Sequence, residues 1–497
     1  MPELRTTRKF KPSSAFRSSE RGYFLLPFRF HRINDEKEVL INEVGDFLIC
    51  PSGTAHKVVD RSISQNSLLY ADLISNFFIS EKPVPDLIDI LATRYRSKKA
   101  FLDQFTALHI FVVTLRCDHS CHYCQVSRKT QNKVDFDMST ADIDKSINLM
   151  FKTPSRSITM EFQGGEPLLA FDKVQYAVLR AKELNKSFEK KISFVICTNL
   201  TNITDEMLDF CKQHDILLST SFDGPQFLHD KNRPKSGAAS YDLFVAKLEK
   251  SRKALGHDRV SALMTTTKLS LEHPIEIIDS YLEHGFSSIF LRPISPYGFA
   301  LKNEKKNRYE TEKFLDFYKT GLQYILQLND QGTFIIEEYA SIILRKLLTP
   351  FSVGYVDLQS PAGAINSVIV YNYDGYVYAS DEARMLAENN DFTFRLGHVA
   401  SDSYQELFYG EKAKKIAEVW ANESLPGCSE CGFQSICGAD PVHNHATQGD
   451  PVGYRPTNSF CKRNMEIIRF LIELLNNKSL NAEKIFRSWL TINERSQ

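Results

Sequence analysis

The chain has 497 residues, 42% of them hydrophobic and 25% charged, which is typical of a globular protein with about two to four domains. Lys plus Arg and Asp plus Glu both number 61, so no net charge attracts nucleic acid or an anionic membrane. The basic start has no apolar signal segment, and no apolar run reaches the roughly 18 residues of a membrane span. We therefore expect a cytoplasmic protein that binds neither nucleic acid nor membrane.

The chain begins with a polar, basic segment, residues 1–20, for which we expect a disordered tail. Residues 21–100 follow with strand-like runs and then two short helical patterns, SLLYADLISNFF and VPDLIDILATRY. This order predicts a small N-terminal α+β domain.

Residues 101–330 alternate apolar strand-like runs with amphipathic helical stretches. The strand-like runs are residues 108–115, 157–162, 192–198, 216–222, 260–267 and 287–294. Such continuous apolar runs are typical of parallel strands that are covered on both faces. Eight strand–helix units would close a barrel, whereas six leave an open, curved sheet. We therefore expect an α/β fold with a partial (β/α)6 TIM-like barrel, whose chemistry lies on the loops after the strands.

The loop after the first of these strands holds Cys117, Cys121 and Cys124. A [4Fe–4S] cube normally takes four thiolates, so three leave one iron with an open position, where a substrate or cofactor can bind. The alternative is a zinc site that His119 or His122 completes.

Polar groups also follow the next strands. The sequence FQGGEP, residues 162–167, combines glycines that allow close backbone approach with the carboxylate of Glu166, which can pair with an ammonium group. Further polar side chains come after the third and fourth strands: Asn199, Ser219, Ser221 and Arg233. Together these groups suit one zwitterionic ligand that carries a ribose, and a structural zinc site needs none of them.

The C-x3-C-x2-C loop, with Tyr123 before its last cysteine, and the GGEP motif together resemble radical S-adenosylmethionine (radical SAM) enzymes. The resemblance implies that the three cysteines bind a [4Fe–4S] cluster and that S-adenosylmethionine (AdoMet) chelates its fourth iron. It also implies reductive cleavage of AdoMet to a 5′-deoxyadenosyl radical, which abstracts hydrogen from the substrate.

The same resemblance assigns the contacts to AdoMet residue by residue. The segment that holds the methionine amino group corresponds to Gly164, Gly165, Glu166 and Pro167. Ribose contacts fall on Asn199 and on Ser219 or Ser221, and the carboxylate partner on Arg233.

Residues 331–497 contain a helical pattern at 332–350, a hairpin at 366–380 with an Asp374-Gly375 turn, and a final amphipathic helix. They also hold a second cysteine set: Cys428, Cys431, Cys437 and Cys461. Alone, this set is compatible with a zinc ribbon. After a radical SAM core it resembles the SPASM (or Twitch) extension of peptide-modifying enzymes, which usually carries two auxiliary [4Fe–4S] clusters.

This chain departs from the SPASM pattern at three positions. Ser360, Ser380 and Pro441 stand where the family has cysteines of the first auxiliary cluster, and proline cannot ligate iron while serine does so weakly. The four cysteines that remain correspond to the second auxiliary cluster, so we predict one auxiliary [4Fe–4S] cluster. Asp381, after Ser380, corresponds to a proposed base in some relatives; the alternative is a solvated turn residue. The isolated Cys50, Cys197 and Cys211 read as core residues.

From about Arg94 past Ala300 the sequence is similar to the B-type radical SAM maturases of His-Xaa-Ser systems. That similarity implies a partner peptide or protein with His-Xaa-Ser repeats, a companion radical SAM maturase and an electron donor. Residues 21–100 are similar to small domains that capture a leader peptide by strand addition, with a structural cap as the alternative. A small-molecule substrate, or a non-catalytic iron–sulfur or zinc scaffold, are the other functions that the sequence allows.

Overall fold

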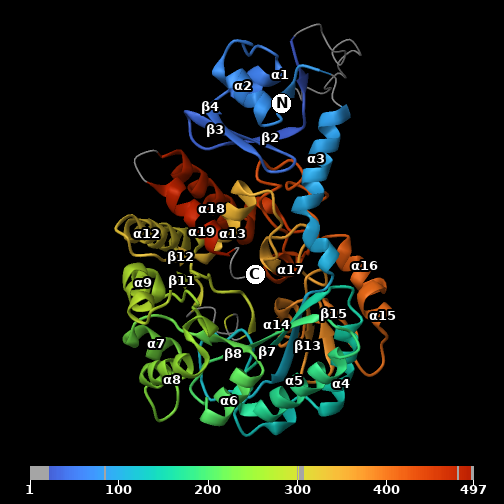
Figure 1. Ribbon diagram of the computed structural model, residues 1–497, viewed down its shortest axis with the longest axis vertical. Helices are drawn as coiled ribbons and strands as arrows, with labels where there is room; N and C mark the ends of the chain where they lie inside the picture. Colours follow the sequence, from blue (N-terminus) through green and yellow to red (C-terminus); the bar gives the residue numbers. More distant parts are fainter. Residues whose placement is uncertain (1–21, 83–84, 299, 301–306, 478–480, 494–497) are drawn as a thin grey trace, which may run out of the picture. The chain divides into compact units, whose positions relative to one another are not determined.

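The computed structural model describes residues 22–82, 85–298, 300, 307–477 and 481–493, so the tail expected at residues 1–20 lies outside it (Figure 1). The chain forms two compact units. Unit 1 comprises Met1–Arg96 and Cys431–Ser435, and unit 2 comprises Ser97–Glu430 and Ile436–Gln497.

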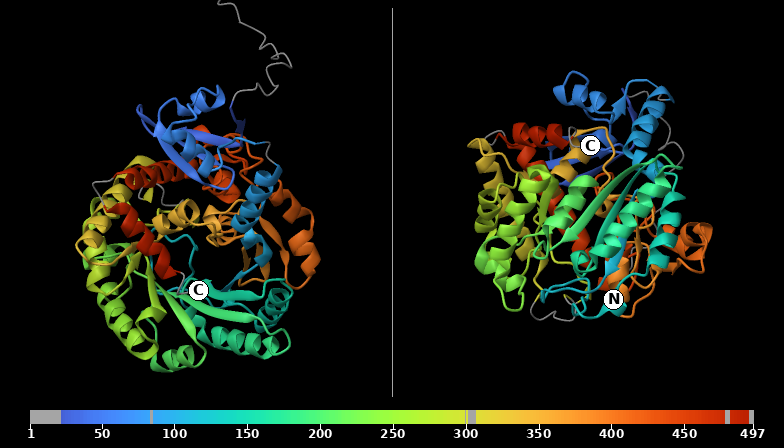
Figure 2. Two further views of the ribbon diagram at one scale, coloured as in Figure 1. Left: turned by 45° about the horizontal axis from the view of Figure 1, so that its top comes forward. Right: turned by 60° about the horizontal axis from the view of Figure 1, so that its bottom comes forward.

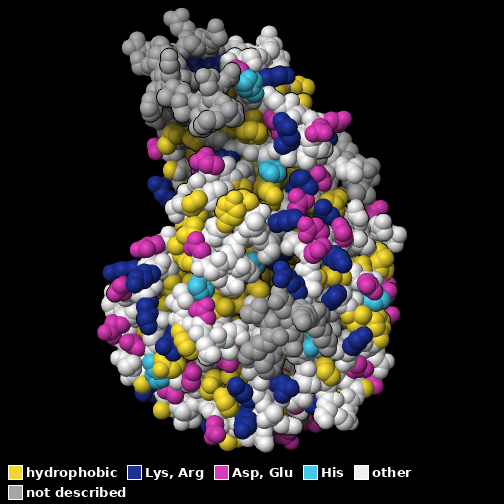
Figure 3. All heavy atoms as spheres, turned by 180° about the vertical axis from the view of Figure 1, so that it is seen from behind, with side chains coloured by type: hydrophobic (Ala, Val, Ile, Leu, Met, Phe, Trp, Pro, Cys, Tyr) yellow, Lys and Arg dark blue, Asp and Glu magenta, His cyan; other side chains and the backbone are white. Residues whose placement is uncertain are grey.

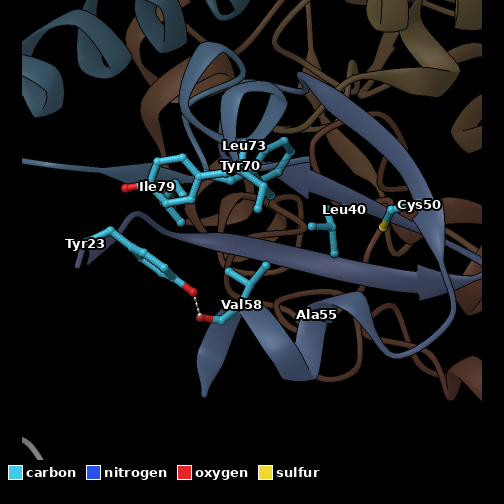
Figure 4. Close-up of a cluster of buried hydrophobic side chains, with 9 residues drawn as sticks. Tyr23, Leu40, Cys50, Ala55, Val58, Tyr70, Leu73 and Ile79 are labelled. Carbon is cyan, nitrogen blue, oxygen red and sulfur yellow. Dashed lines mark hydrogen bonds between the residues drawn. The ribbon is translucent and has the colours of Figure 1, made fainter. Parts of the chain in front are cut away.

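Unit 1 is built on an antiparallel sheet of three strands in the order β2-β3-β4. Its elements are β1 (Phe24–Leu25), β2 (Phe28–Arg32), β3 (Lys37–Asn42), β4 (Phe47–Pro51), α1 (Thr54–Val59), α2 (Leu68–Ser75), β5 (Ile79–Ser80) and most of α3 (Pro85–Lys98). The sequence predicted two or three antiparallel strands, which correspond to β2, β3 and β4, and two of these helices, but neither the pairing of β1 with β5 nor α1. Figure 4 shows the core, where Cys50 is buried beside Leu40 and the Tyr23 hydroxyl donates to Val58 O at 3.0 Å.

One edge of this sheet is approached by a distant part of the chain. A Cβ on Gly432 would lie 2.7 Å from the carbonyl oxygen of Phe30, and the rings of His31 and Phe433 are 4.4 Å apart. Residues 431–435 therefore pack along β2. A peptide that added a strand to unit 1 at this position would have to displace them, which leaves β4 as the other edge strand.

Unit 2 contains a sheet of eight strands in the order β10-β9-β8-β7-β6-β13-β14-β15. Their bounds are β6 (Leu108–Thr114), β7 (Ser157–Gly164), β8 (Lys191–Thr198), β9 (Ile216–Ser221), β10 (Val260–Leu263), β13 (Val368–Tyr371), β14 (Tyr376–Tyr378) and β15 (Arg395–His398). Strands β6 to β10 are parallel, which confirms the α/β fold with a partial barrel. They are the first five strands that the sequence predicted.

The sixth predicted strand is shorter than expected. Only Ser288–Ile289 forms β11, and it pairs in parallel with β12 (Ile336–Glu337) in a separate two-stranded sheet. A single bridge between Thr266 and Pro293 links the segments that follow β10 and β11. The predicted helix at 332–350 was correspondingly too long, because α13 (Glu338–Leu348) begins only after β12.

Helices connect the parallel strands and lie along one face of the sheet (Figure 2). They are α4 (Thr140–Phe151), α5 (Phe171–Asn185), α6 (Asp205–Gln213), α7 (Gln226–Asn232), α8 (Ser240–Leu255) and α9 (Pro274–Glu283). Alternate residues such as Met160 and Phe162 are buried, whereas Glu161 and Gln163 line a cavity. The strands therefore have one apolar and one cavity-lining face, and the expectation of two covered faces was wrong.

The predicted hairpin forms β13 and β14, with Gly375 in the turn at φ +80°, where a side chain would be strained. β13 also pairs in parallel with β6, so that Val368 lies opposite Leu108. The C-terminal region thus extends the sheet beside its first strand. This places the residues that follow the hairpin at the same cavity.

The rest of unit 2 is helical. The helices are α12 (Thr311–Asp330), α13, α14 (Asp381–Ala387), α15 (Tyr404–Tyr409), α16 (Glu411–Ala417), α17 (Pro441–Gln448), α18 (Ser459–Asn476) and α19 (Ala482–Asn493). The sequence predicted α18 as the last helix and missed α19, whose Trp489 is fully buried. In the described part of the chain, no helix is long and apolar enough to cross a membrane. On the face in Figure 3, basic and acidic side chains are interspersed.

Buried Glu337 gives the fold a pH dependence. Its carboxylate accepts hydrogen bonds from Tyr318 Oη (2.5 Å), Ala340 N (2.6 Å) and Leu291 N (3.1 Å), and burial raises its pKa from 4.5 to about 7. Between these values the carboxyl is protonated only in the folded state, so rising pH favours unfolding. Relative to Glu337→Gln, the free energy of unfolding of the unaltered protein should fall by about 3 kcal/mol between pH 4.5 and 8. Denaturant titrations of both proteins across this range check it, and parallel curves would contradict it.

Candidate active site

A cavity of about 480 Å³ opens at the carboxyl ends of strands β6 to β10. Of the twelve residues that the sequence predicted for the first cluster, AdoMet and the base, ten line it. They are Cys117, Cys121, Cys124, Gly164, Gly165, Asn199, Ser219, Ser221, Arg233 and Asp381. Ser219 and Ser221 share a face because side chains along β9 alternate. The roles assigned to these residues stay predictions, but the structure brings the residues together.

The cysteine loop is closed by its own backbone. Cys117 N donates to Lys129 O at 2.9 Å, and Cys124 N donates to Cys121 O at 3.3 Å. All three thiols are free, and burial raises the pKa of Cys117 well above its ordinary value and that of Cys121 to about 12. Three thiols on one loop beside a cavity are suited to a metal centre that binds them as thiolates.

The glycines of the GGEP loop pack directly on the strand that leads into the cysteine loop. A Cβ on Gly164 would lie 1.9 Å from Thr114 O, and one on Gly165 would lie 2.2 Å from Arg116 O. Hydrogen bonds hold this approach, from Gly165 N to Thr114 O (2.8 Å) and from Glu166 N to Arg116 O (2.7 Å). The loop therefore lies beside the cysteines because it has no side chains at these two positions.

Glu166 is fully buried and does not line the cavity. Its carboxylate accepts from Leu168 N (3.0 Å), Thr198 Oγ1 (2.6 Å) and Asn199 N (2.7 Å), and burial raises its pKa to about 7. The structure thus shows Glu166 fixing the backbone at Asn199. Its predicted contact with an ammonium group stays a prediction, as does that of the neighbouring buried Pro167.

Asp118 organises the polar wall, a role that the sequence analysis missed although the residue lies inside the cysteine motif. Its carboxylate contacts His119 Nδ1 (3.0 Å), Asn199 Nδ2 (2.8 Å) and the Lys235 ammonium. Burial alone would raise its pKa, but the hydrogen bonds from His119 and Lys235 lower it. Asn199 is therefore held toward the cavity by a charged group.

The same network bears on the zinc alternative. The ligand atoms of Cys117, Asp118 and His119 lie within 4.8 Å of one another. However, His119 Nε2 contacts Ser240 Oγ at 2.9 Å and its Nδ1 contacts Asp118, so both ring nitrogens already have partners. His122 Nδ1 contacts Asn307 Oδ1 at 2.5 Å. His119 therefore has no ring nitrogen left for zinc, whereas the contact of His122 Nδ1 with an amide oxygen is one that a zinc-bound histidine also makes.

Arg233 is held at the cavity by Asp223. The guanidinium pairs with Asp223 Oδ1 at 3.0 Å and lies 5.5 Å from the ring of Tyr123, whose hydroxyl donates to Asp223 Oδ2 at 2.6 Å. The Nε of Arg233 is buried and has no hydrogen-bond partner among the described residues. A carboxylate in the cavity can satisfy such a donor.

Asp381 is not a solvated turn residue. It begins α14, lines the cavity and lies 3.6 Å from the buried Arg384 guanidinium, and burial raises its pKa. The adjacent Glu382 lines the same cavity, and burial, with repulsion from Asp357 and Asp381, raises its pKa to about 8. Glu382, which the same turn brings to the cavity, was not predicted from the sequence.

Two further residues of the cavity wall were not predicted. Arg292, after β11, forms no hydrogen bond or ion pair through its guanidinium with any described residue. Cys197 also lines the cavity, beside Glu161, so its interpretation as a core residue was wrong. The reason is that alternate β8 positions face the cavity and not a second layer of helices. Cys211, by contrast, is buried as expected.

The three positions that lack the family's cysteines have structural roles. Ser360 Oγ donates to Glu423 Oε2 at 2.5 Å and accepts from Asn422 N at 2.9 Å. Ser380 caps α14 by accepting from Ala383 N at 3.2 Å, and Pro441 begins α17. Of the cysteines in the second set, Cys431 belongs to unit 1, and Cys428, Cys437 and Cys461 belong to unit 2.

Comparison with known proteins agrees with this geometry. Residues 111–281 match the family model of the Radical SAM superfamily. The cysteine-type anaerobic sulfatase-maturating enzyme of Clostridium novyi (strain NT) is 23% identical over 378 residues, 73% of this chain and 94% of that enzyme. The serine-type enzyme of Bacteroides thetaiotaomicron is 24% identical over 375 residues, 71% of this chain and 84% of that enzyme.

Solved structures share the fold. The structure of anSMEcpe with bound AdoMet and Kp18Cys peptide aligns with a TM-score of 0.62 at 17% identity, over 77% of this chain and 99% of that chain. Streptococcus suis SuiB bound to the precursor peptide SuiA aligns with a TM-score of 0.50 at 15% identity, over 88% of this chain and 100% of that chain. Residues 111–281 therefore match the radical SAM superfamily, in a chain that is similar to the anaerobic sulfatase-maturating enzymes and to SuiB.

Proposed function

We propose that this protein is a radical SAM maturase that modifies a partner polypeptide with His-Xaa-Ser repeats. The observation that carries the proposal is the single cavity that joins the three cysteines, the glycine loop, Arg233 and Asp381. The similarity to the sulfatase-maturating enzymes and to SuiB supports a polypeptide substrate. A companion maturase and an electron donor complete the proposed system.

The residues fit a [4Fe–4S] cluster and AdoMet. Cys117, Cys121 and Cys124 would hold the cluster, and the unpartnered Nε of Arg233 suits the AdoMet carboxylate. Gly164 and Gly165 line the same cavity, and their loop would hold the amino end of this ligand. When bound, the cluster and AdoMet supply a 5′-deoxyadenosyl radical for hydrogen abstraction.

The chain's own groups then bind, orient and handle protons. Asn199, fixed by Asp118, and the serines of β9 offer hydrogen bonds to a ribose. Asp381, with Glu382 beside it, is positioned to accept a proton from the substrate after hydrogen abstraction.

An anaerobic assay tests the proposal. Iron-reconstituted protein, dithionite and AdoMet should yield 5′-deoxyadenosine, and a co-expressed His-Xaa-Ser polypeptide should change in mass. Cys121→Ala should reduce both signals to background, whereas Cys211→Ala, a buried cysteine away from the cavity, should retain them.

The alternatives give different results in the same assay. No 5′-deoxyadenosine, even with the partner present, would favour a non-catalytic scaffold. Turnover of AdoMet without a change in the partner's mass would favour a small-molecule substrate.

We also propose one auxiliary [4Fe–4S] cluster, held by Cys428, Cys431, Cys437 and Cys461. The roles of Ser360, Ser380 and Pro441 in hydrogen bonding and helix starts support the absence of a further cluster.

A further inference from the structure

Lys346 of α13 contacts one of the proposed auxiliary ligands. Its ammonium donates to Cys437 O at 3.0 Å and to Leu358 O at 2.5 Å. The backbone around Cys437 is closely held, since a Cβ on Gly438 would lie 2.5 Å from Leu358 Cα and Ala439 N donates to Gln359 O at 3.0 Å. Lys346 therefore bridges the cysteine and the Val356–Leu358 segment, part of which lines the active-site cavity.

The charges around Lys346 are unbalanced. It forms no ion pair with a carboxylate of the described residues. Two further lysines lie nearby: Lys98 Nζ donates to Lys346 O at 2.7 Å, and Lys99 pairs with Glu423 at 2.7 Å. Burial lowers the pKa of Lys346 to about 7, and among the neighbouring groups Cys437 opposes this most strongly, ahead of Glu423. An ammonium that is partly removed from water needs a counter-charge, and the carboxylate of Glu423 already pairs with Lys99.

We propose that Lys346 is the counter-charge of the auxiliary cluster and sets its reduction potential; this rests on the auxiliary cluster proposed above. Four thiolates give a [4Fe–4S] cluster a net negative charge, and reduction adds one more. A cation beside Cys437 stabilises the oxidised cluster and stabilises the reduced cluster more. Lys346 therefore holds the cluster and makes it easier to reduce.

Redox titration of the full-length, reconstituted protein tests this role. Electron paramagnetic resonance would follow the cluster signal that does not change when AdoMet is added. Lys346→Met should make reduction about tenfold less favourable, which for one electron is about 59 mV. Lys346→Arg, which keeps the charge, should leave the potential close to that of the unaltered protein. Lys98→Met is the matched control, because Lys98 contacts the same helix end but not Cys437.

Each outcome decides the proposal. An unchanged reduction potential in Lys346→Met overturns the proposal. A reduction potential that falls as far in Lys346→Arg as in Lys346→Met also overturns it, and the lysine would then be purely structural. If Lys346→Met loses about four irons per chain, retention of that iron by Lys346→Arg supports the role of the charge, and loss in both variants overturns it. Absence of a second cluster from the unaltered protein overturns the auxiliary cluster itself and Lys346's role with it.

Discussion

Gly165→Ala should weaken AdoMet binding at least tenfold. The added Cβ would lie 2.2 Å from Arg116 O and 2.5 Å from Leu115 O, which are backbone atoms and cannot rotate away. Overpacking of this kind costs about 1–3 kcal/mol, and the GGEP loop can relieve it only by moving away from the cysteine loop. Calorimetric titration of the reconstituted protein with AdoMet measures the effect.

Gly354→Ala is the matched control, since nothing lies within 4 Å of its added Cβ. It should bind AdoMet like the unaltered protein. The same strain should also lower the Tm of Gly165→Ala relative to the unaltered protein, which thermal unfolding of the purified proteins measures. An affinity and Tm equal to those of Gly354→Ala would show that the glycine contact does not position the ligand.

Cys428→Ala should lower the iron content from about eight to about four atoms per chain, because two [4Fe–4S] clusters account for about eight. Loss of one thiolate from a four-cysteine site removes the ligand set for that cube, while the cysteine loop of the cavity is untouched. Iron and sulfide assays after anaerobic reconstitution give the count.

Ser380→Ala serves as the control for this count. Its hydroxyl caps α14, so its loss should cost about 1 kcal/mol of stability and no iron. Iron near twelve atoms in the unaltered protein would contradict the single auxiliary cluster, and so would an unchanged count in Cys428→Ala.

Local patterns predicted much of this molecule. Apolar runs marked β6 to β10, and the spacing of Cys117, Cys121 and Cys124 placed them on one loop at the end of β6. These features depend on residues close in sequence, whose periodicity and turn chemistry are readable. The common cavity followed because parallel strands end at one edge of a sheet.

Long-range pairing was not predictable in the same way. Nothing in the sequence near Val368 indicates that β13 pairs with β6, or that Ile336 leaves a helical pattern to pair with β11. Cys197 looked like a core residue because the sequence of an apolar strand does not reveal which of its faces lines a cavity. Glu382 was not predicted because Asp357, whose charge acts on it, is distant in sequence and lies near it only in the folded chain.

The pairing of β13 with β6 has a consequence for any attempt to dissect the protein. A fragment that ended after residue 330 would keep every cysteine of the first loop. However, β6 would become an exposed edge strand with Ile110 and Phe111 on it, and such an edge promotes aggregation. The active-site cavity would also lack the wall that carries Asp381 and Glu382. The parallel-stranded region and the C-terminal region therefore share one sheet. If the C-terminal region is exchanged for that of a similar protein, the new hairpin must pair with β6 in the same way.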